Sequence, residues 1–401
     1  MSRPDLLARL ALASEERARN GLLRRMRTIT AIDGAHVVID GRRLRNFASN
    51  DYLGLAAHPL VREAMTRAAA RWGVGATAAH LLGGHRDEHE QLEHELAQWT
   101  GRSDALLFSS GYMANLGVMQ TVLEPRAICV QDKLNHVCLL DGAHLSGARL
   151  KRYRHLDVDS ARRQLEGDAE LPALIASDGV FSMDGDIAPL RELSDLAAQQ
   201  HASLMIDDAH GIGVLGADGA GSLREAGLDE QQVPILMATL GKALGVCAAF
   251  VAGPKALVDG LRQFARTQIY TTAMPPALAA AIRAALRLAR DDHERRARLH
   301  ARVAQFRAGA EQLGLTLIAS RTPIQPLLVG DSEQALALAQ ELEAAGFFVP
   351  AIRPPTVPAD SARLRITLSA SHEEADVAAL LDAMAGITRK LRIYHPGMAS
   401  Q

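Results

Sequence analysis

The sequence predicts an α/β fold, in which a large domain with a mostly parallel seven-stranded sheet precedes a smaller α+β C-terminal domain. Two observations lead to this prediction. Seven short, continuously apolar runs occur between residues 105 and 251, and helical segments separate them. Strands buried on both faces have this apolar character, and their alternation with helices is typical of a parallel sheet covered on both sides.

The seven candidate strands are Ala105–Phe108, Ala127–Val130, Leu150–Tyr153, Ala173–Ala176, Leu204–Ile206, Ile235–Ala238 and Ala248–Val251. In open sheets of this class, ligands collect outside the carboxyl ends of the strands. The residues that directly follow each run are therefore the first candidates for binding and chemistry.

The length of the chain favours more than one subdomain, because 401 residues exceed what a single hydrophobic core usually fills. We expect an N-terminal helix and hairpin segment over residues 1–58. The large α/β domain is expected over residues 59–285, and the α+β domain over residues 286–401.

The N-terminal segment contains an amphipathic helix and a hairpin. The helix is predicted from Leu6 to Met26 and is interpreted as docking on a surface through its leucines, Leu6, Leu7, Leu10, Leu22 and Leu23. The hairpin is predicted from His36 to Phe47 around Asp40-Gly41, because both central residues of a two-residue turn need positive φ.

Helices are next predicted from Pro59 to Arg71 and from Asp87 to Thr100, the second with Leu92, Leu96 and Trp99 facing inward. A long helical stretch, Ala277 to Leu313, leads into the smaller domain. That domain is predicted to contain strands Pro326–Val329, Phe347–Val349 and Arg363–Leu368 and helices Glu333–Ala345 and Glu373–Ile387. In its last strand, alternation places Arg363 and Arg365 on the face opposite the leucines.

The amino-acid composition argues against nucleic acid and membranes as partners. The formal net charge is -2, which gives no electrostatic footprint for nucleic acid. Three scattered cysteines fit a reduced compartment, and no apolar run reaches the length of a membrane span. We expect a cytoplasmic protein with neither nucleic acid nor membrane as a partner.

The first informative strand end is the turn Ser109–Asn115, in which small residues follow an apolar run and open a helix. Backbone amides at such a turn, together with the helix dipole, can bind phosphate. An ordinary strand-to-helix turn is the alternative interpretation.

Asp207 follows the run Leu204–Ile206. A carboxylate at the end of a buried strand is costly without a cation, so we expect a positively charged partner. Helix capping and a metal site are the alternatives.

Lys242 lies among small and apolar residues in Met237–Gly245. Burial in such surroundings would lower the pKa of its amine towards the range of a nucleophile, although most lysines are solvated surface charges.

Three other patterns resemble binding motifs but are not interpreted as binding sites. Gly211–Gly216 matches a dinucleotide fingerprint, but a loop follows it where a helix is required. Gly241-Lys242 resembles the end of a phosphate-binding P-loop, but the other positions that this motif requires are missing. The histidines His80, His85, His89 and His94 are interpreted as a solvated helix face, so no metal site is expected.

Pyridoxal phosphate requires four groups that this sequence offers together. They are a lysine with a lowered pKa, a buried acid, an imidazole and a phosphate-binding turn. The lysine can attach covalently to the aldehyde, the acid can keep the pyridine nitrogen protonated, and the turn can hold the phosphate. Asp207 precedes Lys242 by 35 residues, a spacing that spans one crossover between neighbouring strands.

Five separated motifs, in this order along the chain, resemble the α-oxoamine synthases. They are Ser109–Tyr112, Gly179–Asp186, Asp207–Gly211, Thr239–Lys242 and Arg363–Arg365, and the resemblance runs from about residue 20 to 390. It implies a fold-type I pyridoxal-phosphate transferase that condenses an amino acid with an acyl thioester and releases carbon dioxide. The stretch Ala351–Pro358 most resembles the biotin-pathway branch, which joins L-alanine to a pimeloyl thioester of coenzyme A or acyl carrier protein.

The resemblance also implies roles for single residues. Lys242 would hold the cofactor and move the substrate α-proton, Asp207 would pair with the pyridinium, and His136 would stack on the ring. His210 and Ser182 would contact the phenolic oxygen of the ring. The phosphate would be served by Ser110, Gly111, Tyr112 and Thr239, and by Thr271 and Thr272 of a second subunit in a homodimer. Arg365 would clamp a substrate carboxylate, with Asn50 and Arg24 near the substrate. Lys242, His136, Asp207 and His210 would form the catalytic set.

Some positions depart from the family pattern. Gly75–His80 replaces a glycine- and serine-rich run, and Asp178 stands where glutamate is common. The alternatives are sister synthases that use glycine or serine with another acyl-CoA, and a catalytically silent partner subunit. Ile352–Pro355 argues against the glycine enzymes, and the presence of both Lys242 and Asp207 argues against a silent subunit.

Overall fold

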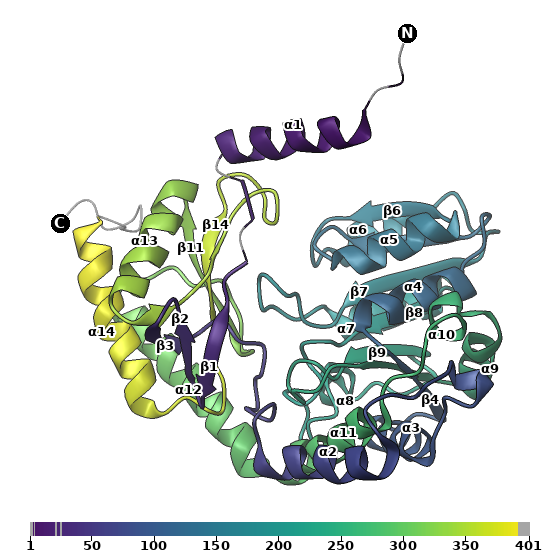
Figure 1. Cartoon of the computed structure of the whole chain (residues 1–401). Helices are drawn as coiled ribbons and strands as arrows, with labels where there is room; N and C mark the ends of the chain where they lie inside the picture. Colours follow the sequence, from purple (N-terminus) through teal and green to yellow (C-terminus); the bar gives the residue numbers. More distant parts are fainter. Residues whose placement is uncertain (1–2, 4, 21, 25, 392–401) are drawn as a thin grey trace.

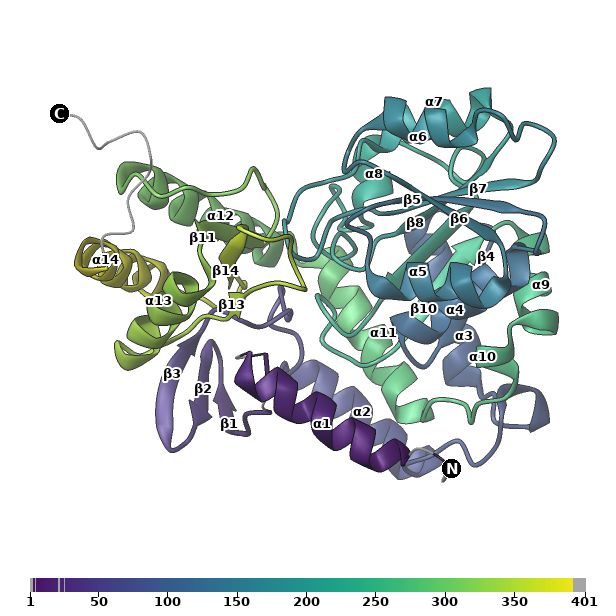
Figure 2. The ribbon, with the colours of Figure 1, turned by 90° about the horizontal axis from the view of Figure 1, so that it is seen from above.

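The chain forms two lobes in a computed structural model that describes residues 3, 5–20, 22–24 and 26–391 (Figure 1). The larger lobe contains the seven-stranded sheet, and the smaller lobe contains the N-terminal strands and the C-terminal segment (Figure 2). The predicted α/β architecture with a smaller α+β unit is confirmed.

All seven predicted strands lie in the large sheet. They are β4 (Asp104–Phe108), β5 (Ile128–Asp132), β6 (Arg149–Tyr153), β7 (Ala173–Asp178), β8 (Ser203–Asp207), β9 (Ile235–Thr239) and β10 (Ala249–Gly253). Their order is β4-β10-β9-β8-β7-β5-β6, and only β10 runs antiparallel to its neighbours. The carboxyl ends of the other six strands therefore meet at one edge of the sheet.

Helices cover both faces of this sheet. One face packs against α4 (Gly111–Val122), α5 (Val137–Ser146) and α9 (Lys255–Phe264), and the other against α6 (Val158–Leu165), α7 (Leu190–Gln199) and α8 (Ser222–Ala226). The remaining elements of this lobe are α2 (Pro59–Trp72), η1 (His80–Leu82), α3 (Asp87–Thr100) and α10 (Arg266–Ile269). The core side chains predicted for α3, Leu92, Leu96 and Trp99, are buried.

The long helical stretch predicted from Ala277 to Leu313 is in fact two helices. α11 (Pro276–Asp291) and α12 (His293–Gln312) are separated by Asp292, whose backbone is not helical. Its carboxylate accepts a hydrogen bond from the Arg295 N–H at 2.9 Å, which caps the second helix. The break places α12 beneath the smaller lobe.

The smaller lobe combines the two ends of the chain. One sheet contains β1 (Ile29–Asp33), β2 (His36–Ile39), β3 (Arg42–Asn46) and β12 (Phe347–Phe348), and the other contains β11 (Ile324–Gly330), β13 (Ala351–Ile352) and β14 (Ala362–Thr367). Helices α13 (Ser332–Ala344) and α14 (Glu374–Lys390) complete the lobe. The predicted hairpin is confirmed, with φ of 51° at Asp40 and 75° at Gly41, whereas β1 and β13 were not predicted.

Strand β12 pairs in parallel with β3, so the N-terminal hairpin and the C-terminal segment share one sheet. The division of the chain at residues 58 and 285 remains a proposal. Its first and third parts share one sheet, so we propose that they fold together. Residues 392–401 of the third part lie outside the described residues.

The N-terminal helix is shorter than predicted. α1 (Leu6–Arg19) ends before Met26, and residues 21 and 25 of the predicted helix lie outside the described residues. Its leucines are exposed, Leu7 by 75%, and the helix projects from the lobes (Figure 1). The expected docking surface is therefore not found among the described residues of this chain. None of the helices in the described part is long and apolar enough to cross a membrane.

Candidate active site

A pocket of about 190 Å³ opens at the carboxyl edge of the large sheet. Most of the predicted site residues line it, although they come from the ends of different strands. These are Gly111, Tyr112, His136, Ser182, Asp207, His210, Thr239 and Lys242. The sheet topology brings them together because parallel strands deliver their following residues to one edge.

Lys242 lies in the loop after β9 with its amine in the pocket. Burial lowers the pKa of this amine to about 8, although the negative charges of Asp207 and Asp178 oppose the shift. About a tenth of the amine is therefore neutral and nucleophilic at pH 7, and about half at pH 8.

His210 connects Lys242 to Tyr52. Its Nε2 lies 2.7 Å from Lys242 Nζ, and its Nδ1 lies 2.6 Å from Tyr52 Oη. Burial, together with the Lys242 charge, lowers the pKa of His210 well below its usual range, so the ring is neutral. A neutral imidazole has one donor and one acceptor nitrogen. It therefore accepts from a charged Lys242 while donating to Tyr52, or donates to a neutral Lys242 while accepting from Tyr52.

Asp207 ends β8 at the floor of the pocket. Its carboxylate accepts hydrogen bonds from Asn115 Nδ2 at 2.7 Å and from the Ala209 N–H at 3.0 Å. Over the described part of the chain, no cationic side chain forms an ion pair with Asp207, so the predicted positive partner is not a protein side chain. The carboxylate is positioned for a cation that enters the pocket.

The turn before α4 has the predicted geometry of an anion site. Ser110 caps the helix, because its Oγ and its carbonyl oxygen accept from the N–H groups of Met113 and Ala114 at 3.3 and 3.0 Å. The N–H groups of Gly111 and Tyr112 remain for an anion at the positive end of the helix dipole. Ser110 itself does not line the pocket.

Thr239 lies on the other side of this turn. Its side chain lines the pocket, and its hydroxyl donates to the Ala248 carbonyl at 3.0 Å.

His136 is the N-cap of α5, directly beside the pocket. Its backbone N–H donates to Asp178 at 3.1 Å, and its Nδ1 lies 2.8 Å from Cys138 Sγ. Burial lowers the pKa of the imidazole, with the Lys242 charge acting in the same direction. The ring is therefore neutral, and it lines the pocket.

Six pocket residues were missed by the sequence prediction: Asn115, Cys138 and Asp178, and the apolar Val180, Ala209 and Met237. Asn115 could have been found, because it lies one helical turn after Gly111 and therefore on the same face. Its amide contacts both Asp207 and Cys138, whose Sγ is 2.8 Å away. Asn115 Oδ1 and Asp178 Oδ1 are buried without a hydrogen-bond partner in the described structure. Burial and the nearby Asp207 raise the pKa of Asp178 well above its usual range.

Arg365 and Asn50 lie at the junction of the two lobes. The Arg365 guanidinium donates to the Ser182 carbonyl at 2.6 Å, to Thr367 Oγ1 at 3.1 Å and to Asn50 Oδ1 at 3.2 Å. The Tyr52 hydroxyl is a further hydrogen-bond partner of Arg365, so most of the five N–H donors of the guanidinium are engaged by the protein. Its positive charge is thereby held in place at the junction of the lobes, where it could attract a carboxylate.

Six predicted residues do not line the pocket: Ser110, Asn50 and Arg365, described above, and Arg24, Thr271 and Thr272. Arg24 is exposed, and Thr271 and Thr272 lie on the segment after α10. Thr272 forms a β-bridge with Ala79, which fixes that segment against the loop before η1. Neither threonine lines the pocket of its own chain.

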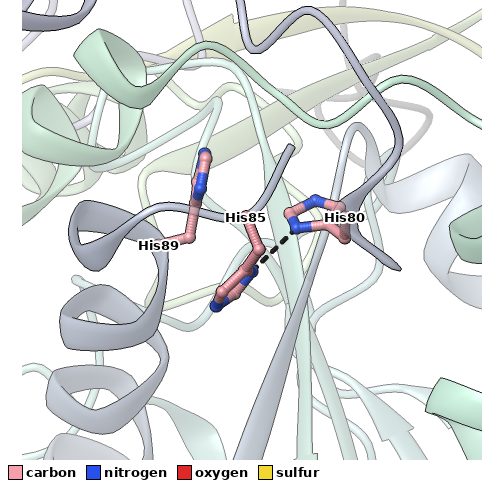
Figure 3. Close-up of side chains that lie close together, drawn as sticks. All are labelled: His80, His85 and His89. Atoms are coloured by element: carbon pink, nitrogen blue, oxygen red, sulfur yellow. Dashed lines mark hydrogen bonds between the residues drawn. The ribbon is translucent and has the colours of Figure 1, made fainter. Parts of the chain in front are cut away.

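The prediction for the histidines was wrong. His80, His85 and His89 converge, and their ring nitrogens lie within 4.8 Å of one another (Figure 3). His89 is fully buried, and only His94 lies on the solvated face of α3.

Comparison with known proteins places this pocket in a family. The sequence pattern described as aminotransferase class I and II matches residues 42–384 of the chain. The chain belongs to the class I and II aminotransferase family. Within this family, it is 52% identical to an 8-amino-7-oxononanoate synthase of Cellvibrio japonicus (strain Ueda107), over 96% of each chain.

Two solved structures of family members are similar. A serine palmitoyltransferase from S. paucimobilis, with bound PLP and myriocin, has a TM-score of 0.92 at 27% identity, covering 97% of this chain and 100% of that one. An 8-amino-7-oxononanoate synthase from Francisella tularensis has a TM-score of 0.77 at 28% identity, covering 86% and 98%. The resemblance to the α-oxoamine synthases is therefore confirmed.

The pocket residues fit pyridoxal phosphate. Asp207 has a carboxylate without a protein cation, suited to a protonated pyridine nitrogen, and the turn at Gly111 offers free amides to a phosphate. Lys242 provides a neutral amine for the aldehyde, and the partnerless oxygens of Asn115 and Asp178 leave polar groups for a bound molecule.

Proposed function

We propose that the chain condenses L-alanine with a pimeloyl thioester, releasing carbon dioxide and forming 8-amino-7-oxononanoate. Pyridoxal phosphate is its cofactor. The observation that carries the proposal is the gathering of Lys242, His210 and Asp207 in one pocket of a chain that is 52% identical to such a synthase. We infer that the thioester is carried by coenzyme A or by acyl carrier protein.

Bound pyridoxal phosphate supplies an electron sink for bonds broken at the α-carbon of the amino acid. Asp207 maintains the positive charge on the pyridine nitrogen that this sink requires, and Asn115 holds the carboxylate in place at 2.7 Å. His136 covers one face of the ring. Gly111 and Tyr112 offer their amides to the phosphate at the start of α4.

Lys242 performs the proton transfer in this proposal. Its amine, with a pKa of about 8, can take the α-proton of alanine and return a proton later in the reaction. His210 lies 2.7 Å away and keeps the amine oriented, and Tyr52 holds the other side of the imidazole. Proton transfer by a placed group of this kind contributes about 10²–10⁴-fold to a rate.

Arg365 orients the amino acid. Its guanidinium can hold the alanine carboxylate, while Ser182 and Asn50 fix the plane of the guanidinium. A fixed carboxylate determines which α-carbon bond stands in the reactive direction. Because Arg365 comes from the smaller lobe, this contact also requires that the lobes keep their arrangement.

We infer a homodimer in which Thr271 and Thr272 contact the cofactor phosphate of the partner subunit. Both residues lie outside the pocket of their own chain. Exposed apolar side chains also occur in the neighbouring segments: Val74 (88%), Leu82 (80%), Tyr270 (72%) and Phe264 (68%). Exposed apolar side chains that gather on one surface are typical of an interface between subunits, and we infer that these side chains meet those of the partner subunit.

The test is an assay of the holoenzyme with pimeloyl-CoA and, in turn, alanine, glycine or serine. Mass spectrometry should detect 8-amino-7-oxononanoate with alanine, and the rate should be highest with this amino acid. The Lys242→Ala variant is the control and should form no product above background. A clear preference for glycine or serine would instead assign the chain to a sister α-oxoamine synthase.

A further inference from the structure

Three histidines from one short stretch gather beside the large sheet, away from the pocket of Lys242. His80 begins η1, His85 lies in the following turn, and His89 is in the first turn of α3 (Figure 3). The ring centroids are 5.2 to 5.4 Å apart in all three pairs. The three rings therefore form a compact triangle.

The backbone between these histidines is built for a tight reversal. Gly83 has φ of 89°, and the Gly84 N–H donates to the Ala79 carbonyl at 2.9 Å. A Cβ on Gly84 would lie 2.0 Å from the Ala78 carbonyl oxygen, so no other residue fits there without a shift of the backbone. This reversal brings His85 back to His80.

We propose that His80, His85 and His89 form a binding site for a divalent transition-metal ion of the Zn²⁺ class. Imidazole nitrogens are preferred ligands of such ions, and three of them leave a fourth position for water. The Nδ1 atoms of His80 and His85 are 2.9 Å apart and share one hydrogen bond. Two nitrogens on one tetrahedral Zn²⁺ lie about 3.3 Å apart, given Zn–N bonds of about 2.0–2.1 Å. A small opening of the pair therefore admits the ion in place of the shared proton.

His89 provides the third ligand. Its Nε2–H donates to the Met274 carbonyl at 2.8 Å, which is the second-sphere contact that usually orients a metal-binding histidine. Its Nδ1 then has a lone pair for the ion. This lone pair accepts from the Arg86 N–H at 2.9 Å, so metal binding exchanges that capping bond for a coordinate bond.

The surroundings keep all three rings neutral, which is the form that binds a metal. Burial lowers the pKa of His80 to about 4, and the neighbouring histidines add to the effect. Burial also lowers the pKa of His85 and of His89. Around His85, the carboxylate of Glu90 and the guanidinium of Arg262 act in opposite directions.

The ion would brace a segment that matters to the rest of the chain. The Ala273 N–H donates to the Ala78 carbonyl at 3.0 Å, and Ala79 bridges Thr272. A metal on His80 and His85 would therefore fix the loop against which Thr271 and Thr272 rest. Binding of the ion itself does not depend on the proposed function.

The test is calorimetric titration of chelator-treated holoenzyme with ZnCl₂, together with metal analysis after gel filtration. We expect about one tightly bound Zn²⁺ per chain in the wild type. His85→Ala and His80→Ala should each weaken binding about 100-fold or more, because even loss of a second-sphere partner costs about 10–100-fold. Each variant is first checked by its circular dichroism and by its retained cofactor absorbance.

His94→Ala is the matched control, because His94 is an exposed histidine on the same helix. This variant should bind Zn²⁺ like the wild type, and Zn²⁺ should raise the thermal midpoint of both proteins but of neither ligand variant. A wild-type chain that retains no Zn²⁺ would overturn the proposal. So would unchanged binding by folded His85→Ala and His80→Ala, because the ion would then sit elsewhere, for example at the exposed Cys247.

Discussion

Lys242 determines how the proposed site should respond to pH. Burial lowers the pKa of its amine to about 8, and only the neutral amine attacks an aldehyde. The rate at which the apoprotein attaches pyridoxal phosphate should therefore rise with pH up to about 8 and level off above it. Stopped-flow absorbance measurements across pH 6 to 10.5 would check this, since a rate still rising at about pH 10 would indicate a solvated lysine.

Single residues at strand ends could be predicted from the sequence, whereas their contacts could not. Asp207 and Lys242 follow apolar runs, and this position alone marks them as candidates. Asn115 contacts Asp207 from within a helix, and Tyr52 contacts His210, the partner of Lys242, from a distant loop. Contacts of that kind depend on how the segments pack, so they cannot be predicted from a pattern of neighbouring residues in the sequence.

The turn after Lys242 provides a test at the scale of an element. Gly245 has φ of 72°, its N–H donates to the Lys242 carbonyl, and a Cβ there would lie 2.4 Å from the Ala56 backbone nitrogen. Gly245→Ala should destabilise the chain by about 2–4 kcal/mol, from backbone strain and overpacking together. It should also displace Lys242 and lower the turnover.

Gly260→Ala is the matched control for this substitution. Gly260 lies within α9 with no atom near the added methyl group, so the change should stabilise the chain by about 0.5–1 kcal/mol. Urea unfolding of both variants would compare them. Equal stability of the two would show that the Gly245 turn can relax.

His155 connects the end of β5 to the loop that contains Ser182. Its two ring nitrogens contact Asp132 at 3.0 Å and Asp186 at 2.9 Å. Burial opposes the charged form, but these carboxylates outweigh it and raise the pKa of His155 to about 10. Because this folded-state pKa exceeds the usual value of about 6.5, the stabilisation is complete below pH 6.5 and is lost as pH rises through 10.

The His155→Gln variant should therefore melt at a lower temperature than the wild type at pH 6 to 7. The difference between the two melting temperatures should shrink as the pH passes 10. Paired thermal scans at both pH values would measure it. A difference that stays constant with pH would mean that packing, and not charge, accounts for the role of His155.

The elements that the sequence predicted well are those with a strong local pattern. The seven strands have continuous apolar runs, and the hairpin turn has the Asp40-Gly41 signal. The break at Asp292 was missed although its capping signal was present, because the helical pattern continues on both sides. The histidine cluster was missed because the reversal at Gly83 and Gly84, not helical periodicity, brings its members together.

The arrangement of the whole molecule was the hardest to predict. The pairing of β3 with β12 joins segments about 300 residues apart, and neither strand identifies the other in sequence. The smaller lobe then presents Arg365 to the large lobe at the Ser182 carbonyl. The exposed leucines of α1 likewise find no partner surface among the described residues of this single chain.

The inferred dimer makes a prediction about mixed subunits. Alone, a Lys242→Ala chain should be inactive, and a chain with Thr271→Ala and Thr272→Ala should be weakly active. When they are refolded together, heterodimers gain one site with an intact lysine and intact partner threonines. Random pairing should then restore about a quarter of wild-type activity. If the threonines served their own chain, mixing would restore nothing.

The central claim is that Lys242 is the residue that holds the cofactor. The most direct measurement is reduction of the holoenzyme with borohydride, followed by proteolysis and mass spectrometry of the peptides. We expect a pyridoxyl-phosphate mass on the peptide that contains Lys242, and none on any peptide of the Lys242→Ala variant. A modification on a different lysine, or no modification of the coloured wild-type protein, would contradict it.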